Sequence, residues 1–263
     1  MEKLKISEIW IYPVKSLGGI RMSYSRVFPK GLEYDRRWML IEDTGKFMTQ
    51  RMYPEMSLFK AKYHSGSFSI HYNNESIQLP FTSIDSSLTA QIWNDEVTVH
   101  EVSREHSVWF SERLKQECKL VSFPENNPRP VDRNYAVNND QVSLADAYPL
   151  LIIGQSSLDD LNQRLTVPVP MNRFRPNIVF TDGEPYIEDG WKYFRAGKNR
   201  FAAVKPCSRC VLTTIDQESG AKGYEPLSTL SVYRMKDNKV YFGQNVIPLN
   251  YHEITEGDEI VPE

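Results

Sequence analysis

Lys205-Pro206-Cys207-Ser208-Arg209-Cys210 is the segment around which the second half of this sequence is organised. It contains two of the chain's three cysteines and continues as Val211-Leu212-Thr213-Thr214-Ile215. These branched residues predict a β-strand over residues 211–215, directly after the cysteines. Lysine and arginine neighbours lower the pKa of a thiol from about 8.5 and favour the thiolate, a nucleophile and soft metal ligand. The segment therefore predicts thiolate chemistry in a β-rich region.

The spacing of Cys207 and Cys210 is compatible with four kinds of site. A structural zinc site needs four ligands, but Cys118 lies far away along the chain and the histidines are scattered. A thioredoxin-like dithiol begins a helix, whereas strand-forming residues follow Cys210. The two thiols can also be packed side chains without chemistry. In the fourth interpretation one cysteinate binds a metal cofactor and the other cysteine is its neighbour.

Composition and charge restrict the class of protein. The chain has 263 residues, 40% of them hydrophobic and 25% charged, with a net charge of −3, as in ordinary globular proteins. Nucleic-acid binders usually carry a large basic excess, so we expect no nucleic-acid partner. An odd, small number of cysteines favours a reducing compartment, and residues 1–6 do not resemble a signal peptide. We therefore expect a cytoplasmic protein without a membrane segment.

Short β-forming runs alternate with turn signals in the first hundred residues. These runs cover residues 9–12, 38–41, 68–72 and 97–102. They predict a small β-sheet or barrel. From Glu105 the apolar spacing changes to that of a helix. Its expected buried face consists of Val108, Trp109, Phe110, Leu114 and Cys118.

The turn-rich residues 124–130 predict a connection between two domains, residues 1–123 and residues 124–263. Further strands are expected at residues 150–153, 177–180, 201–204 and 240–242. Ser156 is the expected N-cap of a helix, and Pro226 the expected start of a short one. The predicted fold is mixed α+β but predominantly β, with a few peripheral helices.

Cations and amides recur at the ends of these predicted strands. They occur in the segments Tyr12-Pro13-Val14-Lys15-Ser16, Asp35-Arg36-Arg37-Trp38, Asn172-Arg173-Phe174-Arg175-Pro176-Asn177 and Phe242-Gly243-Gln244-Asn245. Each arginine alone is typical of a solvated surface. Together they are also suited to surround an anionic ligand that carries phosphate, because guanidinium groups match phosphate oxygens in pairs.

These segments and the cysteine segment have the order and spacing found in the MOSC proteins, which the whole chain resembles. The branch that contains the mitochondrial amidoxime-reducing component and its bacterial relatives is the most similar. The resemblance implies an N-terminal MOSC β-barrel domain over residues 1–123, packed on a barrel-like MOSC domain over residues 124–263. The family is also associated with pyridoxal phosphate binding.

The resemblance implies a molybdenum-molybdopterin cofactor whose metal is bound by the cysteine after the Ser-Arg pair, Cys210, which is then also the catalytic residue. The residues implied to bind the rest of the cofactor are Lys15, Ser16, Arg36, Asp146, Arg175, Asn177, Ser208, Arg209 and Gln244. Relatives often have hydroxyl side chains around the aspartate, where this chain has Ala145 and Ala147.

The activity implied by the resemblance is the reduction of N-hydroxylated compounds, such as amidoximes, hydroxylamines and N-hydroxylated bases. Some relatives carry a ferredoxin domain, for which this sequence lacks the cysteines. We therefore expect electrons to come from a separate donor, a flavin reductase or a ferredoxin-like or cytochrome-like protein. Two alternatives are a carrier of sulfur or of cofactor in molybdenum cofactor maturation, and a binding module without turnover.

Overall fold

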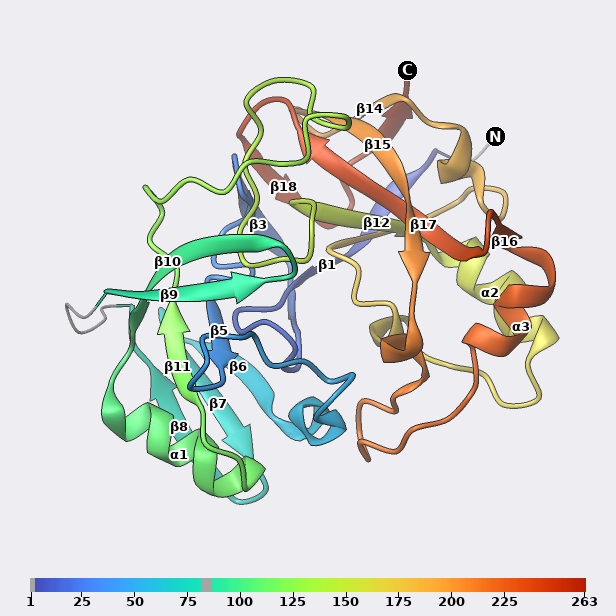
Figure 1. Ribbon diagram of the computed structural model, residues 1–263. Coiled ribbons are helices and arrows are strands. Elements are labelled where there is room, and N and C mark those ends of the chain that lie inside the picture. The colour runs from blue at the N-terminus through green and yellow to red at the C-terminus, as the bar shows by residue number, and fades with distance from the viewer. Residues whose placement is uncertain (1–2, 82–86) are drawn as a thin grey trace.

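A mixed sheet of nine strands is the largest part of the computed structural model, which describes residues 3–81 and 87–263 (Figure 1). Its strands are β1 (Lys5–Ile11), β2 (Ile20–Met22), β12 (Leu150–Gly154), β13 (Ile178–Thr181), β14 (Tyr193–Ala196), β15 (Asn199–Arg209), β16 (Met235–Lys236), β17 (Lys239–Pro248) and β19 (Ile260–Pro262). They lie in the order β19-β14-β15-β17-β12-β13-β1-β2, with β16 paired to β17. β12 and β13 are parallel, and the other pairs are antiparallel.

Three smaller sheets complete the described part of the chain. One contains β5 (Trp38–Ile41), β9 (Ser87–Ile92), β10 (Asp95–Glu101) and β11 (Lys119–Ser122). The others contain β6 (Lys60–His64), β7 (Ser67–Tyr72) and β8 (Glu75–Leu79), and β3 (Tyr24–Phe28), β4 (Gly31–Leu32) and β18 (Glu253–Thr255). β1 and β2 belong to the large sheet, and β3 pairs with β18, so both halves of the sequence share strands. The division after residue 123 stays a prediction.

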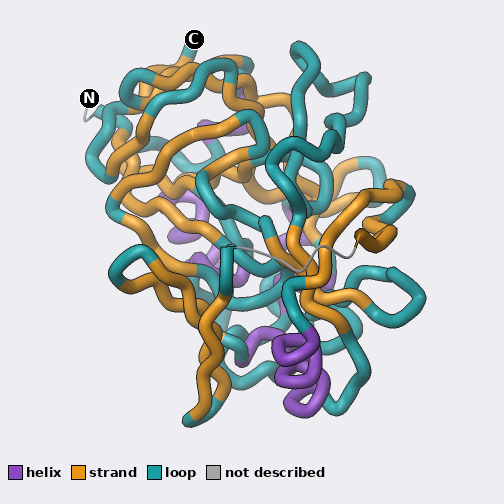
Figure 2. The backbone as a smooth tube through the Cα atoms, turned by 90° about the vertical axis from the view of Figure 1, so that its left-hand side faces the viewer, coloured by secondary structure: helices purple, strands orange, loops and turns teal. Residues whose placement is uncertain are grey.

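Helices form a small share of the backbone and lie beside the sheets (Figure 2). The α-helices are α1 (Arg104–Leu114), α2 (Gln155–Arg164) and α3 (Leu227–Tyr233). Short 3-10 helices are η1 (Pro54–Leu58), η2 (Met171–Arg173), η3 (Ile187–Gly190) and η4 (Val211–Thr214). No helix within residues 3–81 or 87–263 is long and apolar enough to cross a membrane. The predominantly β fold with a few helices is confirmed.

The predicted face of α1 was partly wrong. Val108 is 46% exposed, whereas His106 and Ser107 are buried beside Phe110. The helix ends at Leu114 because Lys115 adopts a left-handed conformation, so the buried Cys118 lies beyond it. The pattern thus included an exposed position and continued past the true end of the helix.

Two other local predictions were also wrong. Ser156 lies inside α2, whose N-cap is Gly154 without a side-chain cap. Residues 211–214 form η4 rather than a strand, because the amide and hydroxyl of Thr213 both donate to the carbonyl of Cys210. The strand lies before the cysteine segment and includes most of it, since β15 ends at Arg209.

A bulge in β17 lies opposite the cysteine segment. Pro206 pairs with Gln244 and Ser208 with Tyr241, so two residues of β17 face the single residue Cys207. One of the two is Gly243, which has φ +78. A β-carbon there would lie 2.6 Å from Cγ1 of Ile153 and 2.8 Å from the carbonyl oxygen of Ile152. The close approach of β17 to β12 at this position therefore leaves no room for a β-carbon.

We expect Gly243→Ala to lower the free energy of unfolding by about 2–3 kcal/mol, because it adds a steric clash to a left-handed backbone. Gly66 is the matched control, because it has φ +81 and open space around its would-be β-carbon. Gly66→Ala should cost about 1 kcal/mol. Urea denaturation of both variants measures the difference, and equal costs would show that the contact with β12 is unimportant.

Candidate functional site

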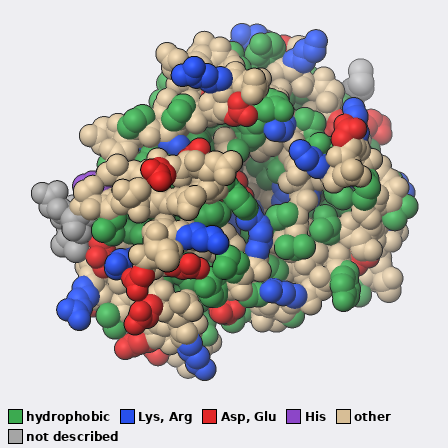
Figure 3. All heavy atoms as spheres, viewed as in Figure 1, with side chains coloured by type: hydrophobic (Ala, Val, Ile, Leu, Met, Phe, Trp, Pro, Cys, Tyr) green, Lys and Arg blue, Asp and Glu red, His purple; other side chains and the backbone are tan. Residues whose placement is uncertain are grey.

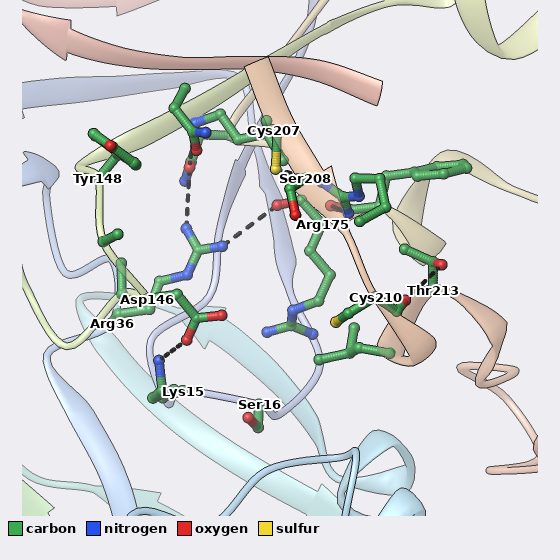
Figure 4. Close-up of a pocket in the computed structure, with 18 of the residues that line it drawn as sticks. Lys15, Ser16, Arg36, Asp146, Tyr148, Arg175, Cys207, Ser208, Cys210 and Thr213 are labelled. Atoms are coloured by element: carbon green, nitrogen blue, oxygen red, sulfur yellow. Dashed lines mark hydrogen bonds and ion pairs between the residues drawn. The ribbon is translucent and has the colours of Figure 1, made fainter. Parts of the chain in front are cut away.

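A cavity is lined by residues of β12, β15 and β17 of the large sheet and by loops that follow β1 and flank β5, and Figure 3 shows lysine and arginine side chains inside this hollow. Its volume is about 850 Å³ with the open mouth included. Nine of the ten residues proposed from the sequence line it: Lys15, Ser16, Arg36, Asp146, Arg175, Asn177, Ser208, Arg209 and Cys210. Residues from distant parts of the sequence therefore share one site (Figure 4).

The tenth residue, Gln244, lies outside the lining of the cavity. Its side chain is 3% exposed, and its Nε2 donates to Oδ1 of Asp189 at 3.0 Å. Asn245, the next residue of β17, lines the cavity and donates from Nδ2 to the carbonyl of Lys205 at 3.2 Å. The position of Gln244 therefore does not support a contact with a ligand in this cavity.

Two arginines stack on Tyr12 at one side of the cavity. The guanidinium carbons of Arg36 and Arg175 lie 4.3 Å and 4.2 Å from the centre of its ring. Arg36 donates to Oδ1 of Asn177 at 3.0 Å and to Oδ2 of Asp35 at 2.5 Å, whereas Arg175 donates to the carbonyl of Leu17. Burial lowers the pKa of Arg175 to about 10. The protein thus keeps two like charges close together, which a bound anion would stabilise.

The backbone is strained at three of the lining residues. Ser16, Arg36 and Arg175 have φ values of 68, 51 and 55, in the left-handed region that non-glycine residues rarely adopt. Each such residue costs of order 1 kcal/mol or more, and strained residues of this kind cluster at functional sites. Because three strained residues line one cavity, we infer that the orientation of their side chains is maintained at a cost in backbone energy.

Lys15 and Asp146 form an ion pair at the base of the cavity, with 2.5 Å between Nζ and Oδ1 (Figure 4). Burial lowers the pKa of Lys15 to about 8, although Asp146 opposes the shift. Desolvation opposes the ionisation of Asp146, but the charges of Lys15 and Arg51 outweigh it and hold its pKa below the usual value. Both members of the pair are therefore charged at neutral pH.

Arg129 holds the loop that carries Asp146. Its Nη1 donates to the carbonyls of Ser143 and Ala145 at 2.6 Å and 2.5 Å, and its Nη2 to that of Asp146 at 3.1 Å. Its Nε and Nη2 also donate to Asp95. The guanidinium is 2% exposed, so a residue of the connection predicted at 124–130 is part of the site's support. The turn signals there gave no indication of this role.

The two cysteines of the segment lie in different surroundings. Cys207 is half-buried, and its Sγ accepts a hydrogen bond from Nη1 of Arg209 at 3.0 Å. Cys210 is exposed and lies at the end of β15, where η4 begins. Arg209 also donates to the carbonyl of Phe174, while its buried Nε has no hydrogen-bond partner among the described residues. Cys210 is therefore the thiol that a ligand reaches most easily.

Arg51 was missed from the sequence and lies beside Cys210. Its Nε is 3.4 Å from Sγ of Cys210, and its Nη2 is 3.0 Å from Oδ2 of Asp146. Arg51 stands in a turn before η1, where a single cation among polar and apolar residues has no distinguishing pattern. Its contact with Cys210 comes from folding across the chain, so local sequence gave no signal for it.

The arginines and the exposed thiol of the cavity fit an anionic cofactor that carries a metal and itself supplies most of the ligands of that metal. Neither Arg175 nor Arg209 forms an ion pair with a carboxylate in the described residues, and Nε of Arg209 is left without a partner. Within residues 3–81 and 87–263 no group of three His, Cys, Asp or Glu side chains is placed to hold a metal ion. The protein thus offers one exposed thiol, which is suited to bind the metal, and unneutralised cations, which are suited to bind a phosphate.

Comparison with known proteins identifies the two halves of the sequence. Residues 3–117 match the MOSC N-terminal beta barrel domain, and residues 139–261 match the MOSC domain. The chain is 34% identical to mitochondrial amidoxime-reducing component 1 of Mus musculus, over 88% of this chain and 72% of that protein. It is 31% identical to molybdenum cofactor sulfurase of Oryza sativa subsp. japonica, over 97% of this chain. It spans about a third (33%) of the length of that sulfurase.

Among solved structures, the YuaD protein of Bacillus subtilis aligns with 98% of this chain and 94% of its own, at 10% identity and a TM-score of 0.42. This structural likeness is too low to support an argument about the site. The two domain matches and the identity to the mouse protein decide the relationship. The chain belongs to the MOSC family.

Proposed function

We propose that the cavity binds a molybdenum-molybdopterin cofactor, with Cys210 as the protein ligand of the metal. The observation that carries the proposal is the combination of one exposed thiol with two arginines, Arg175 and Arg209, that have no carboxylate partner among the described residues. Arg36 and Arg175 would bind the phosphate of the cofactor, and Arg209 would add a positive charge to the lining of the cavity. When bound, the cofactor supplies two-electron chemistry at molybdenum, and the protein supplies orientation and electrostatics.

The proposed reaction is the reduction of an N-hydroxylated compound. The substrate takes up two electrons and two protons, its nitrogen–oxygen bond breaks, and the products are water and the reduced nitrogen compound. In this reaction Cys210 stays a metal ligand, Lys15 and Asp146 stabilise the base of the cavity, and Arg51 holds the sulfur. The relationship to a protein named for amidoxime reduction supports this substrate class.

We expect turnover to require a separate electron donor. Cofactor-loaded protein mixed with an amidoxime alone should produce no amidine, and adding a reduced flavin reductase or a ferredoxin-like or cytochrome-like protein should start production. Product analysis by chromatography measures both reactions. Production of amidine without any added reductant would overturn the proposal, because two electrons must enter for each product molecule.

A second candidate is a carrier of sulfur or of cofactor. Two observations favour it: the exposure of Cys210 and the 31% identity to a molybdenum cofactor sulfurase. A sulfur carrier needs a reachable thiol that receives a persulfide, whereas the proposed reductase has its thiol bound to metal. Mass spectrometry of Cys210 after incubation with a cysteine desulfurase and cysteine separates the two. A persulfide on Cys210 of molybdenum-loaded protein would support the carrier.

The cellular compartment of the protein is also a prediction. The sequence predicts the cytoplasm, while the mouse relative is named as a mitochondrial protein. The compartment of this chain therefore stays a prediction, as does the identity of its donor.

A further inference from the structure

Arg51 brings a charged donor from the first half of the sequence to the proposed metal ligand in the second half. Its Nε lies 3.4 Å from Sγ of Cys210, and its Nη2 lies 3.0 Å from Oδ2 of Asp146. The guanidinium carbon is also 4.5 Å from the centre of the Trp93 ring. A planar group with two edges hydrogen-bonded and one face stacked has a fixed orientation. The donor that faces the sulfur is therefore held by the protein.

The backbone that carries Arg51 is itself anchored. The amides of Met52 and Tyr53 donate to the carbonyl of Thr49, which closes a turn around Arg51. Next to it, the buried side chain of Gln50 donates to the carbonyl of Ser16 at 2.7 Å. Gln50 and Gln217 also exchange two amide hydrogen bonds, of 3.1 Å and 2.9 Å. The turn is thus fixed to Ser16, which lines the cavity, and to Gln217 in the second half of the sequence.

Trp93 is held in place as well. It occupies the turn between β9 and β10 with φ 55, and its ring meets that of Phe47 edge-on at 5.1 Å. The Trp93 residue is 48% exposed. Here it provides a platform for Arg51 at the mouth of the cavity. The contact between Arg51 and Cys210 therefore depends on residues from three separate segments.

We propose that Arg51 is a positioning residue that donates a hydrogen bond to the sulfur of Cys210 and thereby raises the reduction potential of the metal site. Hydrogen bonds to a ligand sulfur withdraw electron density from it and favour the reduced, more electron-rich metal. Guanidinium keeps its charge at all working pH values, so the contact persists. The effect on the potential rests on the proposed function, whereas the contact itself does not.

The contact is tested in protein without cofactor. We expect Arg51→Met to slow the alkylation of Cys210 by iodoacetate at pH 7 about tenfold, because the variant lacks the guanidinium that attracts this anionic reagent to the sulfur. Trypsin cleaves after Arg209 but not between Lys205 and Pro206, so Cys207 and Cys210 lie on different peptides. Mass spectrometry then follows both thiols in one sample, and the rate at Cys207 serves as the internal standard.

Lys222→Met is the matched control. Lys222 carries a charge close by, since its Nζ lies 3.4 Å from the carbonyl oxygen of Arg51. This variant removes one positive charge but keeps the guanidinium beside the sulfur, so the rate at Cys210 should not change. An equal loss in both variants would assign the effect to general charge. An unchanged or faster rate in Arg51→Met would overturn the contact.

The potential is tested in molybdenum-loaded protein. Redox titration followed by electron paramagnetic resonance should give a more negative midpoint potential for Arg51→Met than for Lys222→Met, at equal molybdenum content. Arg51→Lys should give an intermediate value, because an ammonium group cannot span sulfur and carboxylate as the planar fork does. Equal potentials would overturn the proposed role of Arg51. Absence of molybdenum from the unmodified protein would instead refute the proposed function, and the alkylation result would still stand.

Discussion

Cys210→Ala should abolish the reduction of an amidoxime in the presence of a reduced donor. Loss of the protein ligand of the metal should raise the activation free energy by several kcal/mol, which corresponds to a fall of about 10³-fold or more in rate. The side chain is exposed, so its truncation creates no cavity in the core and leaves the stability nearly unchanged. Steady-state turnover measures the effect, and an unchanged denaturation midpoint confirms that the variant is folded.

Cys207→Ala is the matched control for this prediction. Both thiols line the cavity, but Cys207 is half-buried and accepts a hydrogen bond from Arg209. We expect this variant to keep most of its turnover, with at most a modest loss from the freed guanidinium. Equal loss of turnover in the two variants would contradict the distinction between the thiols.

Arg175→Met should weaken cofactor retention by about 10–100-fold, because a charge-assisted hydrogen bond contributes roughly 1.5–3 kcal/mol. Arg175 has no carboxylate partner in the described residues and stacks on Tyr12, so a cofactor phosphate would be its counter-ion. Methionine keeps the apolar stem against the ring. Molybdenum remaining after serial dilution and gel filtration, compared with the unmodified protein, measures the loss.

Arg164→Met is the control for Arg175→Met. Arg164 lies on the surface of α2 and pairs with Asp160, away from the cavity. Its substitution should leave retention unchanged. If Arg175→Met retained cofactor as well as this control does, the phosphate would bind elsewhere.

The sequence predicted most of the site because its chemistry lies at strand ends. Lys15, Arg36 and Cys210 each stand in a short, recognisable segment, and the strands around them show clear β patterns. Since the fold brings these segments together around one cavity, local segments were enough to name the residues that meet there. The same reasoning fails where a residue acts through contacts that only the folded chain creates.

Arg51 and Arg129 illustrate this limit. Each is a single cation in a turn, and its importance comes from partners far away along the chain: Cys210 for Arg51, and the carbonyls of residues 143–146 for Arg129. The positions of Gln244 and Asn245 show a second limit. The bulge at Gly243 shifts the register, and in a strand a shift of one residue changes which side chain faces the cavity.

The misread segment at residues 211–215 has a third cause. Valine, threonine and isoleucine favour strands by their packing on a sheet, but hydrogen bonds from Thr213 to Cys210 close a tight turn here. Because β15 has already ended, residues 211–214 lie outside the strands of the described part of the chain. Intrinsic preference was outweighed by the local hydrogen bonds, which also fix the position of Cys210 at the cavity.

The molybdenum content of protein produced in a host that makes the cofactor tests the central claim most directly. We expect about one molybdenum atom per chain, because the site offers a single cysteine ligand, and a loss of that metal in Cys210→Ala but not in Cys207→Ala. Molybdenum retained by Cys210→Ala at the level of the unmodified protein would contradict the ligand assignment, and its absence from the unmodified protein would contradict the proposed cofactor.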